Sequence, residues 1–450
     1  MNECSGHPVG IDDLSVYVPK LCLSATGEFA TSRKIDPAKL VKGIGIERMA
    51  IPDAHEDAAT MAAMSIKDLM ERNDLKPNQI GKIYIGTESG VDEAKAIGTY
   101  VLGMLEEVYG QGSFEECATV EFKSACIGAT YALENLCNWT ALTEDGNMGI
   151  VVASDIAKYG LNTPGEYTQG AGSVSLLIKK RPRLLALAGR AGSFTKDEND
   201  FFRPLGSNIA VVNGKKSNLC YLMAVQRAFA SYQRKALRGD AIKLENDSCL
   251  TDYISHLLFH IPYPRMAEYA SASIFRQEWR YLPRWKEIEA EIGEEPRPET
   301  FGDIDEYLAA DAAFGKKFSK TRLFLDAFNA KVKDSTTISR QVGNVYTGSL
   351  YLGLASLMEL HKLIPGDRIC FNSYGSGCSA MVFSGIVQLD AENLPSRNIL
   401  KLLNERKEIS LRDYELLHEG RKAESIQDPH HEFALERIDE EGYRHYEFMK

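Results

Sequence analysis

The stretch Glu121-Phe-Lys-Ser-Ala-Cys-Ile-Gly-Ala-Thr-Tyr-Ala-Leu-Glu-Asn-Leu-Cys-Asn-Trp139 combines a short entry segment, a cysteine, small residues and an amphipathic helix. From Thr130 onward, apolar residues recur at three- and four-residue intervals, which predicts that one helix face is buried. Gly128 and Ala129 keep the first turn uncrowded beside Cys126. The positive end of the helix dipole favours the nucleophilic thiolate. Cys126 is therefore a candidate nucleophile, with a buried structural cysteine as the alternative.

The composition predicts one large or two fused α/β units without nucleic-acid or membrane partners. The 450 residues are 44% hydrophobic and 26% charged, which provides for a sizeable core. The net charge is −11, and no Lys/Arg block is interleaved with aromatics. The cysteines have neither disulfide nor zinc spacing. Residues 1–30 lack a signal-peptide pattern and no apolar run reaches about eighteen residues, so we expect a soluble cytoplasmic protein.

The first half of the chain reads as buried strands connected by helices. We predict a strand at Val9–Val18, a helix at Glu56–Glu71, and strands at Gly81–Gly90, Gly149–Ala157 and Gly172–Ile178. Glu88 closes the Gly81–Gly90 strand, and the Cys126 helix follows it.

The second half repeats this pattern. We predict a strand at Leu257–Pro262, a helix opening in Gly343–Leu357, and strands at Arg368–Ser373 and Ala380–Val387. Val152 follows Cys126 by 26 positions and Phe371 follows Asn344 by 27, so helix start and next strand keep one register. We infer two duplicated halves, residues 1–185 and 186–450. The second carries a charged insertion, Trp279–Phe318, which we expect to form exposed helices and turns on the outside.

Packing of the two halves would bring strand ends and helix starts to one cleft, where ligands bind in α/β sheets. That cleft would gather Glu88, Cys126, His260 and Asn344, the set of groups that acyl transfer needs. His256 and His260 have the spacing of a metal pair on a helix, but this segment reads as a strand, so we expect no metal site.

Taken together, the motifs resemble those of the 3-hydroxy-3-methylglutaryl-CoA (HMG-CoA) synthases, a family of thiolase-fold condensing enzymes. The resemblance covers nearly the whole chain. The motifs are Gly-Thr-Glu-Ser (86–89), Ala-Cys-Ile-Gly-Ala-Thr (125–130), Ser-Asp-Ile-Ala-Lys-Tyr-Gly-Leu-Asn (154–162), Thr-Gln-Gly-Ala-Gly (168–172), Phe-Phe-Arg-Pro (201–204), Phe-His-Ile-Pro-Tyr (259–263), Gly-Asn-Val-Tyr-Thr-Gly-Ser-Leu-Tyr (343–351) and Ser-Tyr-Gly-Ser-Gly (373–377). The family implies a thiolase-like α/β fold, with the halves in a layered αβαβα arrangement.

The resemblance implies a role for each of the four central residues. Cys126 would take the acetyl group from acetyl-CoA, with the thioester oxygen held by the backbone N–H groups of Cys126 and Ser376. Glu88 would remove a methyl proton and return one to the new alcoholate, which requires a raised pKa. His260 would hydrogen-bond the acetoacetyl carbonyl, and Asn344 would donate to a thioester or acetoacetyl oxygen.

The family pattern also points to residues around the substrates. Asp155 and Tyr159 match positions near the acyl-cysteine; Asn162, Thr168, Ser217 and Ser376 match positions lining the substrate or CoA site; and Arg265 stands where a Lys usually meets CoA phosphate. Two positions depart from the pattern. Ile127 replaces a common Tyr and would affect closure of the acetyl pocket, and Tyr269 replaces a Lys found in some members and would affect CoA affinity.

The implied activity is the condensation of acetyl-CoA with acetoacetyl-CoA to HMG-CoA and CoA, in the mevalonate pathway, by a cytoplasmic homodimer without a cofactor or a metal. Three alternatives remain. The first is an enzyme of polyketide β-branching that depends on acyl carrier protein. The second is a catalytically silent scaffold, although such a protein has no need for the four central residues. The third is a relative that condenses acyl groups without aldol chemistry, which has no need for Glu88 as an acid/base.

Overall fold

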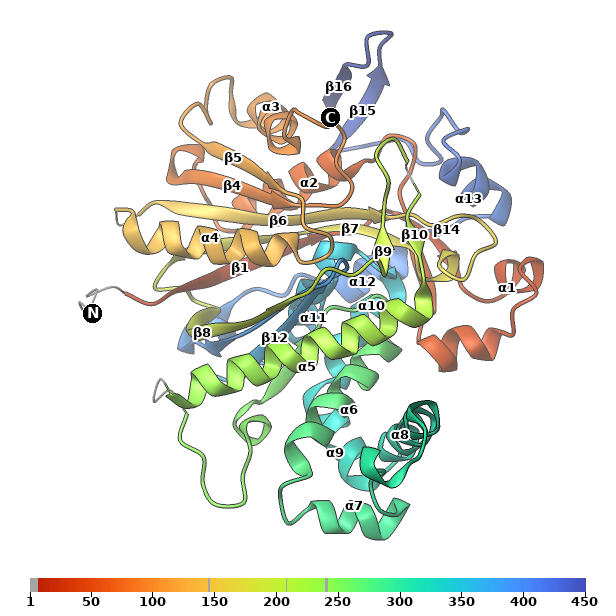
Figure 1. The fold of residues 1–450 in the computed structure, drawn as a ribbon. Helices are drawn as coiled ribbons and strands as arrows, with labels where there is room; N and C mark the ends of the chain where they lie inside the picture. Colours follow the sequence, from red (N-terminus) through yellow and green to blue (C-terminus); the bar gives the residue numbers. More distant parts are fainter. Residues whose placement is uncertain (1–6, 145, 208, 239–241) are drawn as a thin grey trace.

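A nine-stranded mixed sheet forms the framework of the molecule (Figure 1). The computed structural model describes residues 7–144, 146–207, 209–238 and 242–450; Cys4 lies outside them. The strand order is β11-β12-β13-β8-β1-β7-β6-β4-β5. The bounds are β1 Val9–Tyr17, β4 Ile80–Gly86, β5 Ala118–Phe122, β6 Met148–Ala157, β7 Gly170–Lys180, β8 Leu185–Thr195, β11 His256–Phe259, β12 Arg368–Gly375 and β13 Ser379–Val387.

The sheet consists of two half-sheets that share a four-strand topology, and β5 adds a fifth strand beside β4 in the first. In one, β4 runs parallel to β6, and β6, β7 and β1 are successively antiparallel. In the other, β11 runs parallel to β12, and β12, β13 and β8 are successively antiparallel. The half-sheets meet where β1 pairs with β8, through Gly10–Ala186 and Ile11–Leu185. The predicted repeat is therefore confirmed in the order and direction of the strands.

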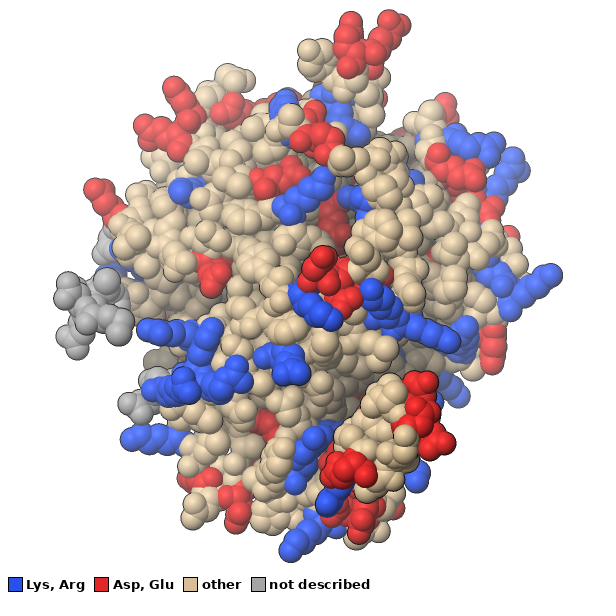
Figure 2. All heavy atoms as spheres, in the orientation of Figure 1, with Lys and Arg blue, Asp and Glu red and all other residues tan. Residues whose placement is uncertain are grey.

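Helices cover both half-sheets and fill the space between them. The principal helices are α2 Ala58–Arg72, α3 Ile97–Tyr109, α4 Gly128–Leu142, α5 Gly214–Arg238, α6 Arg265–Trp279, α10 Thr337–Val342 and α11 Ser349–Glu359. One apolar core lies under α2 and α3, a second under α5 and α6, and a central one joins α4 and α11 to strands of both halves. These three cores confirm the predicted αβαβα layering. Lys and Arg side chains gather along α5 on the outer face (Figure 2).

Two predicted elements differ at the ends that carry functional residues. The strand predicted to Gly90 ends at Gly86, because Glu88 and Ser89 hydrogen-bond the Asp155 side chain instead of a neighbouring strand. The helix predicted to open near Asn344 begins at Ser349, after a short 3₁₀ turn. Cys126 and Asn344 therefore both precede the central helices rather than lie in them.

Glycine permits the close approach of β4 to α4. A Cβ atom on Gly86 would lie 2.2 Å from the backbone nitrogen of Ala129, in the first turn of α4. A Cβ atom on Gly128 would lie 2.6 Å from the carbonyl oxygen of Phe122. Contacts this short cannot form, so both positions need glycine for the start of α4 to sit against the strand ends.

The charged insertion is only partly exposed. It forms α7 Trp285–Ile292 and α8 Ile304–Phe318, followed by α9 Arg322–Lys331. Trp279, Trp285 and Phe318 are buried in the core shared with α5 and α6. The prediction of exposed helices is therefore wrong for this inner face, because the aromatic residues between the charged positions supply a continuous apolar side.

The C-terminal segment returns to the first half of the chain. Its remaining elements are α12 Ile399–Glu405, β14 Lys407–Glu408, α13 Leu411–His418, β15 Glu432–Ile438 and β16 Arg444–Met449. Strand β14 pairs with β2 (Leu21–Ser24), which also pairs with β3 (Arg48–Ile51). Phe433 of β15 packs in the core under α2.

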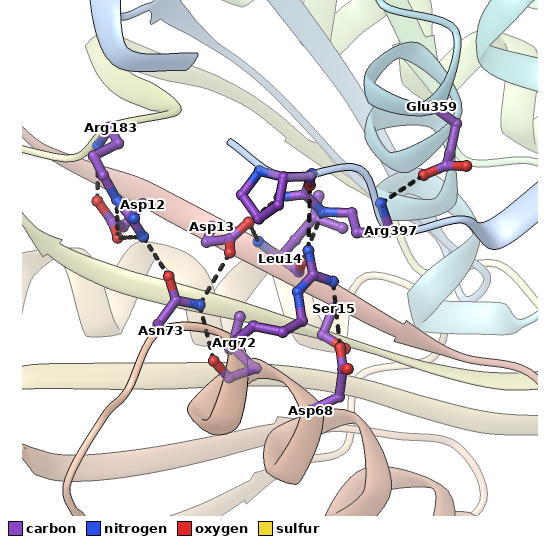
Figure 3. A network of polar contacts seen from close by, with 12 residues as sticks. Asp12, Asp13, Leu14, Ser15, Asp68, Arg72, Asn73, Arg183, Glu359 and Arg397 are labelled. Carbon is purple, nitrogen blue, oxygen red and sulfur yellow. Dashed lines mark hydrogen bonds and ion pairs between the residues drawn. The ribbon is translucent and has the colours of Figure 1, made fainter. Parts of the chain in front are cut away.

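A polar network beside β1 ties the C-terminal segment to the sheet (Figure 3). The buried Asp13 carboxylate pairs with Arg397, whose backbone N–H donates to Glu359 of α11 at 3.0 Å. Asp12 accepts from the Arg183 guanidinium just before β8. The network thus links β1 to both halves of the molecule. Among the described residues, no helix is long and apolar enough to cross a membrane.

Candidate active site

A cavity of about 460 Å³ lies where the ends of the two half-sheets meet. Of the residues predicted from the sequence, Cys126, Tyr159, Thr168, Ser217, His260, Asn344 and Ser376 line it. Exposed members of its lining, including Thr163, Val212 and Gly214, mark its open end. Glu88, Asp155, Asn162 and Arg265 do not line the wall, and their positions are described below.

Cys126 lies at the inner end of the cavity, two residues before α4. The preceding Ala125 has a φ of 47°, a left-handed conformation that is strained for a residue with a side chain. The thiol is 8% exposed and donates a hydrogen bond to Glu88 Oε1 at 2.8 Å. Burial, and then the neighbouring Glu88, raise the pKa of the thiol. The thiolate predicted from the helix dipole is therefore wrong for the free protein, because desolvation and the carboxylate outweigh the dipole.

Glu88 is a buried carboxyl that faces the thiol. It lies two residues beyond the end of β4 and is 7% exposed. Burial, and then the charge of Asp155, raise its pKa to about 8. The raised pKa expected for an acid and base is confirmed, and its main cause is desolvation rather than a single neighbour.

Asp155 holds the Glu88 backbone rather than facing the cavity. Its Oδ1 accepts from the Glu88 backbone N–H at 2.7 Å and from Ser89 Oγ at 2.9 Å. Its Oδ2 accepts from the backbone N–H of Thr347 at 3.1 Å, in the 3₁₀ turn before α11. Asp155 is completely buried, and burial raises its pKa to about 6. It therefore connects the acid of the first half to the Asn344 segment of the second.

His260 enters the cavity as a neutral imidazole. It directly follows β11, is 2% exposed, and its Nδ1 has no hydrogen-bond partner within the described chain. Burial lowers its pKa to about 3. The backbone N–H donates to the Asn372 carbonyl at 2.9 Å, and the Tyr221 hydroxyl donates to the His260 carbonyl at 2.7 Å. These two bonds fix the backbone that carries the ring, and His260 lines the cavity.

Asn344 presents its amide to the same cavity. Its Oδ1 accepts from the backbone N–H of Tyr346 at 2.9 Å and from Ser349 Oγ at 3.0 Å. The –NH₂ group is therefore the donor side of the amide, and it also reaches the Tyr159 hydroxyl. Its backbone N–H donates to the Thr168 carbonyl at 2.9 Å, which joins two predicted lining residues.

Aromatic side chains surround the thiol. Tyr159, Phe201 and Tyr346 pack edge to face, with ring centroids 6.1–6.4 Å apart, in one cluster with Cys126. These rings form the wall of the cavity next to the thiol. Ile127 is fully buried in the central core and does not line the cavity, so its departure from the family pattern does not reach the cavity wall.

Residues 200–204 contribute more than the sequence motif alone suggested. Asp200 is buried and accepts from the Tyr374 hydroxyl and the Gly377 backbone N–H, both at 2.9 Å, and so holds the loop that carries Ser376. Arg203 contacts the backbone of Glu88. The Phe-Phe-Arg-Pro motif was the available signal, but it did not identify these partners.

Arg265 lies beside the cavity, at the start of α6, and faces other partners. It donates to the carbonyl oxygens of Lys42, at 2.7 Å, and Gly43, at 3.2 Å, and pairs with Glu268. Asn162 is exposed, with a φ of 61° and its N–H bonded to Glu166. Tyr269 is 42% exposed. The free chain therefore places neither Arg265 nor Asn162 on the cavity wall.

The site contains the groups needed for acyl transfer and proton transfer. A thiol, a neutral imidazole and an amide line one cavity, and a carboxyl of raised pKa lies outside its wall, hydrogen-bonded to the thiol. Within the described ranges, no group of three or more His, Cys, Asp or Glu residues could hold a metal ion.

Two family models match the chain end to end. The hydroxymethylglutaryl-coenzyme A synthase N-terminal model matches residues 5–182, and the C-terminal model matches residues 187–441. The chain is 33% identical to the hydroxymethylglutaryl-CoA synthase of Haloferax volcanii, covering 98% of this chain and 99% of that protein. It is 33% identical to the synthase of Enterococcus faecalis, covering 91% of each.

Solved structures agree with this match. The fold superposes on MvaS in complex with 3-hydroxy-3-methylglutaryl coenzyme A with a TM-score of 0.82, at 31% identity and 99% coverage of this chain and 100% of that one. The HMG synthase of the curacin pathway has a TM-score of 0.77, at 23% identity and 98% and 100% coverage, and therefore supports the fold alone. The resemblance drawn from the motifs is confirmed: the chain belongs to the hydroxymethylglutaryl-CoA synthase family of acyl-transferring condensing enzymes.

Proposed function

We propose that the protein joins acetyl-CoA to acetoacetyl-CoA through an acetyl-Cys126 intermediate and releases HMG-CoA and CoA. The observation that carries this is the 2.8 Å hydrogen bond between the Cys126 thiol and Glu88, in a cavity that His260 and Asn344 also line. A cysteine acyltransferase needs only a nucleophile and a base. A buried acid of raised pKa beside the thiol suits the additional C–C bond-forming step.

The acetylation step begins with the shared proton. Glu88 takes the Cys126 proton as the sulfur attacks the thioester carbonyl, and the proton leaves with CoA as its thiol. The backbone N–H groups of Cys126 and Ser376 are proposed to hold the oxyanion. Each such donor typically contributes a factor of about 10² to 10³.

Condensation uses Glu88 in both directions. Its carboxylate removes a proton from the acetyl methyl group, and the resulting carbanion equivalent attacks the ketone of acetoacetyl-CoA. His260, which is neutral and lines the cavity, hydrogen-bonds that ketone oxygen. The protonated Glu88 then donates to the alkoxide, and water cleaves the Cys126 thioester to release product and thiol.

The surroundings of the cavity mouth support a carrier that bears negative charge. Lys215 and Lys216 lie in the first turn of α5, next to lining residues Gly214 and Ser217, and Lys216 pairs with Glu198 at 3.0 Å. The N-terminus of this long helix adds positive potential. CoA phosphates suit this end, and we propose CoA as the carrier of both acyl groups.

The carrier-protein enzyme of β-branching is the second candidate, because an acidic carrier helix would also suit this basic end. The greater identity to hydroxymethylglutaryl-CoA synthases, 33% against 23% for the curacin enzyme, favours the CoA-dependent function and the mevalonate pathway.

The test is a two-stage incubation. Purified protein receives acetyl-CoA, then acetoacetyl-CoA; the Cys126 peptide is followed by mass spectrometry and the product by chromatography. Acetyl-Cys126 followed by HMG-CoA supports the proposal. Cys126→Ala should abolish both signals, whereas Cys137→Ala, a matched change on α4, should retain them. Condensation only with an acetoacetyl carrier protein supports the second candidate, and no acetylation from either donor supports a silent scaffold.

We further propose a cytoplasmic homodimer that needs no cofactor. Strand β5 at the sheet edge is partly exposed, with Val120 43% exposed, and offers unpaired backbone groups to a second copy. The groups that the proposed reaction uses all come from the chain itself. Light scattering tests the mass, and activity after dialysis against a chelator tests the cofactor.

A further inference from the structure

The peptide of Glu88 is held between two charged side chains. On one side, its N–H donates to the Asp155 carboxylate at 2.7 Å. On the other, its carbonyl oxygen accepts from Nη2 of Arg203, which directly follows β9 (Phe201–Phe202). These contacts join segments distant in sequence, so the Glu88 backbone cannot shift without breaking one of them.

We propose that Arg203 is a positioning residue that holds the Glu88 peptide against Asp155 and supplies the positive charge that offsets the Asp155 carboxylate. The inference rests on the proposed function, because it assigns Arg203 to the acid and base of that reaction. Arg203 itself does not line the cavity around Cys126. It lines a second cavity, of about 490 Å³, on the other side of the Glu88 segment, together with Ser89.

The charges around Glu88 explain why Arg203 matters. Three titratable groups affect the pKa of Glu88: Asp155 of β6, Cys126 before α4 and Arg203 after β9. Glu88 in turn affects the pKa of Tyr159 and Tyr346 in the aromatic cluster. Burial and then Asp155 raise the pKa of Glu88, whereas the hydrogen bond from Cys126 and then the charge of Arg203 lower it. Without Arg203 the carboxyl would stay protonated to higher pH, and less of it could act as a base near neutrality.

Replacement of Arg203 should therefore change a pH midpoint and not merely a rate. A neighbouring charge typically changes a carboxyl pKa by about one unit or more. In Arg203→Met and Arg203→Gln, we expect the midpoint at which condensation gains activity to rise by about one pH unit. Arg203→Lys keeps the charge and should stay near the wild-type midpoint. Arg322→Met removes an exposed arginine of α9 and serves as the matched control.

A second measurement is independent of the proposed function. Because the Cys126 thiol donates to Glu88, loss of the Glu88 proton raises the thiol pKa, and alkylation should stop accelerating with pH at that point. The rate of alkylation by iodoacetamide is read on the Cys126 peptide by mass spectrometry. We call the pH at which alkylation stops accelerating the break. We expect the break to rise by about one pH unit in Arg203→Met and Arg203→Gln, and to be unchanged in Arg203→Lys and Arg322→Met.

The outcomes separate the two proposals. If folded Arg203→Met or Arg203→Gln stops accelerating in alkylation at the same pH as the wild type, the proposed role of Arg203 is wrong, even if activity falls equally at every pH. Raised breaks in a protein whose wild type forms no HMG-CoA would support Arg203 while refuting the proposed function. If both neutral variants fail to fold while Arg203→Lys folds with a wild-type break, the arginine charge serves the fold, and the proposal also fails.

Discussion

Substitution of Glu88 by Gln should change the reactivity of Cys126 and the condensation rate in opposite directions. Gln has nearly the same shape but neither ionises nor accepts a proton. In the wild type, the group that titrates first is Glu88, whose pKa is about 8, and the thiol pKa is raised further by that carboxylate. Above this pH the pair has already lost one proton, and that proton comes almost entirely from Glu88. The thiolate beside a neutral carboxyl and the thiol beside a carboxylate hold the same number of protons, so the fraction of reactive thiolate no longer rises with pH.

The size of the effect follows from that pKa. In Glu88→Gln, the thiolate fraction should keep rising tenfold per pH unit beyond pH 8, until the thiol itself titrates. At pH 9, one unit above the Glu88 pKa of about 8, Cys126 alkylation should therefore be about tenfold faster than in the wild type. At pH 7 the two rates should be similar, because Glu88 is then mostly protonated and already neutral.

Condensation should change the other way. General acid–base catalysis typically contributes about 10² to 10⁴-fold, so Glu88→Gln should lose at least about 10²-fold in HMG-CoA formation at every pH. Acetylation of Cys126 should still occur, but only from the thiolate, because Gln cannot take the thiol proton. The assays are alkylation and acetylation of the Cys126 peptide by mass spectrometry, beside product formation. Glu93→Gln changes an exposed acid on the same loop and should leave all three unchanged. Parallel alkylation profiles for wild type and Glu88→Gln from pH 7 to 10 would refute the coupling.

Three further predictions concern stability and protonation. Gly86→Ala should destabilise the fold by about 1–3 kcal/mol or more in urea titrations, because its Cβ would lie 2.2 Å from the α4 backbone. The control Gly103→Ala, in open space on α3, should stabilise the fold by about 0.5–1 kcal/mol. Arg397→Met leaves a buried carboxylate unpaired and should cost about 3–5 kcal/mol by the same assay, while Lys401→Met breaks an exposed pair and should cost under about 1 kcal/mol. The His260 pKa of about 3 lies below that of the unfolded chain, so stability should fall as pH drops below about 6.5, by up to roughly 1.4 kcal/mol per unit; His260→Asn should weaken that dependence in urea titrations at pH 7 and pH 5.

The convergence of Cys126, His260 and Asn344 on one cavity was predictable because it follows from topology. Each residue stands just after a strand or just before a central helix, and equivalent ends of duplicated halves meet at one edge. The apolar runs determined the strands, and glycines marked their ends. This reasoning needs only local patterns and a repeat, both of which the sequence contains.

The protonation state of Cys126 could not be obtained in the same way. The helix dipole is a local property, and it indicates a thiolate. Burial and the carboxylate of Glu88, which lies 38 positions earlier, depend on tertiary packing and have the larger effect. The same limit applies to Asp155, which was predicted to lie near the acyl-cysteine. Its charge does act on Cys126, but its hydrogen bonds, which fix the backbone that presents Glu88, were not predictable.

Arg265 illustrates a different limit. The family pattern suggested a cation for CoA phosphate, but the structure directs this guanidinium to the carbonyl oxygens of Lys42 and Gly43. These partners lie more than two hundred positions away, on a segment that no local periodicity connects with α6. Lys215 and Lys216 lie nearer the open end of the cavity, and of these two Lys216 pairs with Glu198.

Burial gives the reactive groups one shared property. Desolvation is the largest contribution to the raised pKa of Cys126, to the Glu88 pKa of about 8 and to the His260 pKa of about 3. At neutral pH the thiol and the imidazole are therefore neutral and the Glu88 carboxyl is mostly so. A neutral cavity accepts an uncharged thioester without displacing a strongly hydrated ion. Negative charge then develops on the substrate oxygen during the reaction. The low dielectric constant of the buried site strengthens each hydrogen bond to that oxyanion. The same burial that makes Cys126 a poor thiolate at rest thus favours its reaction once a substrate supplies the oxygen that bears the charge.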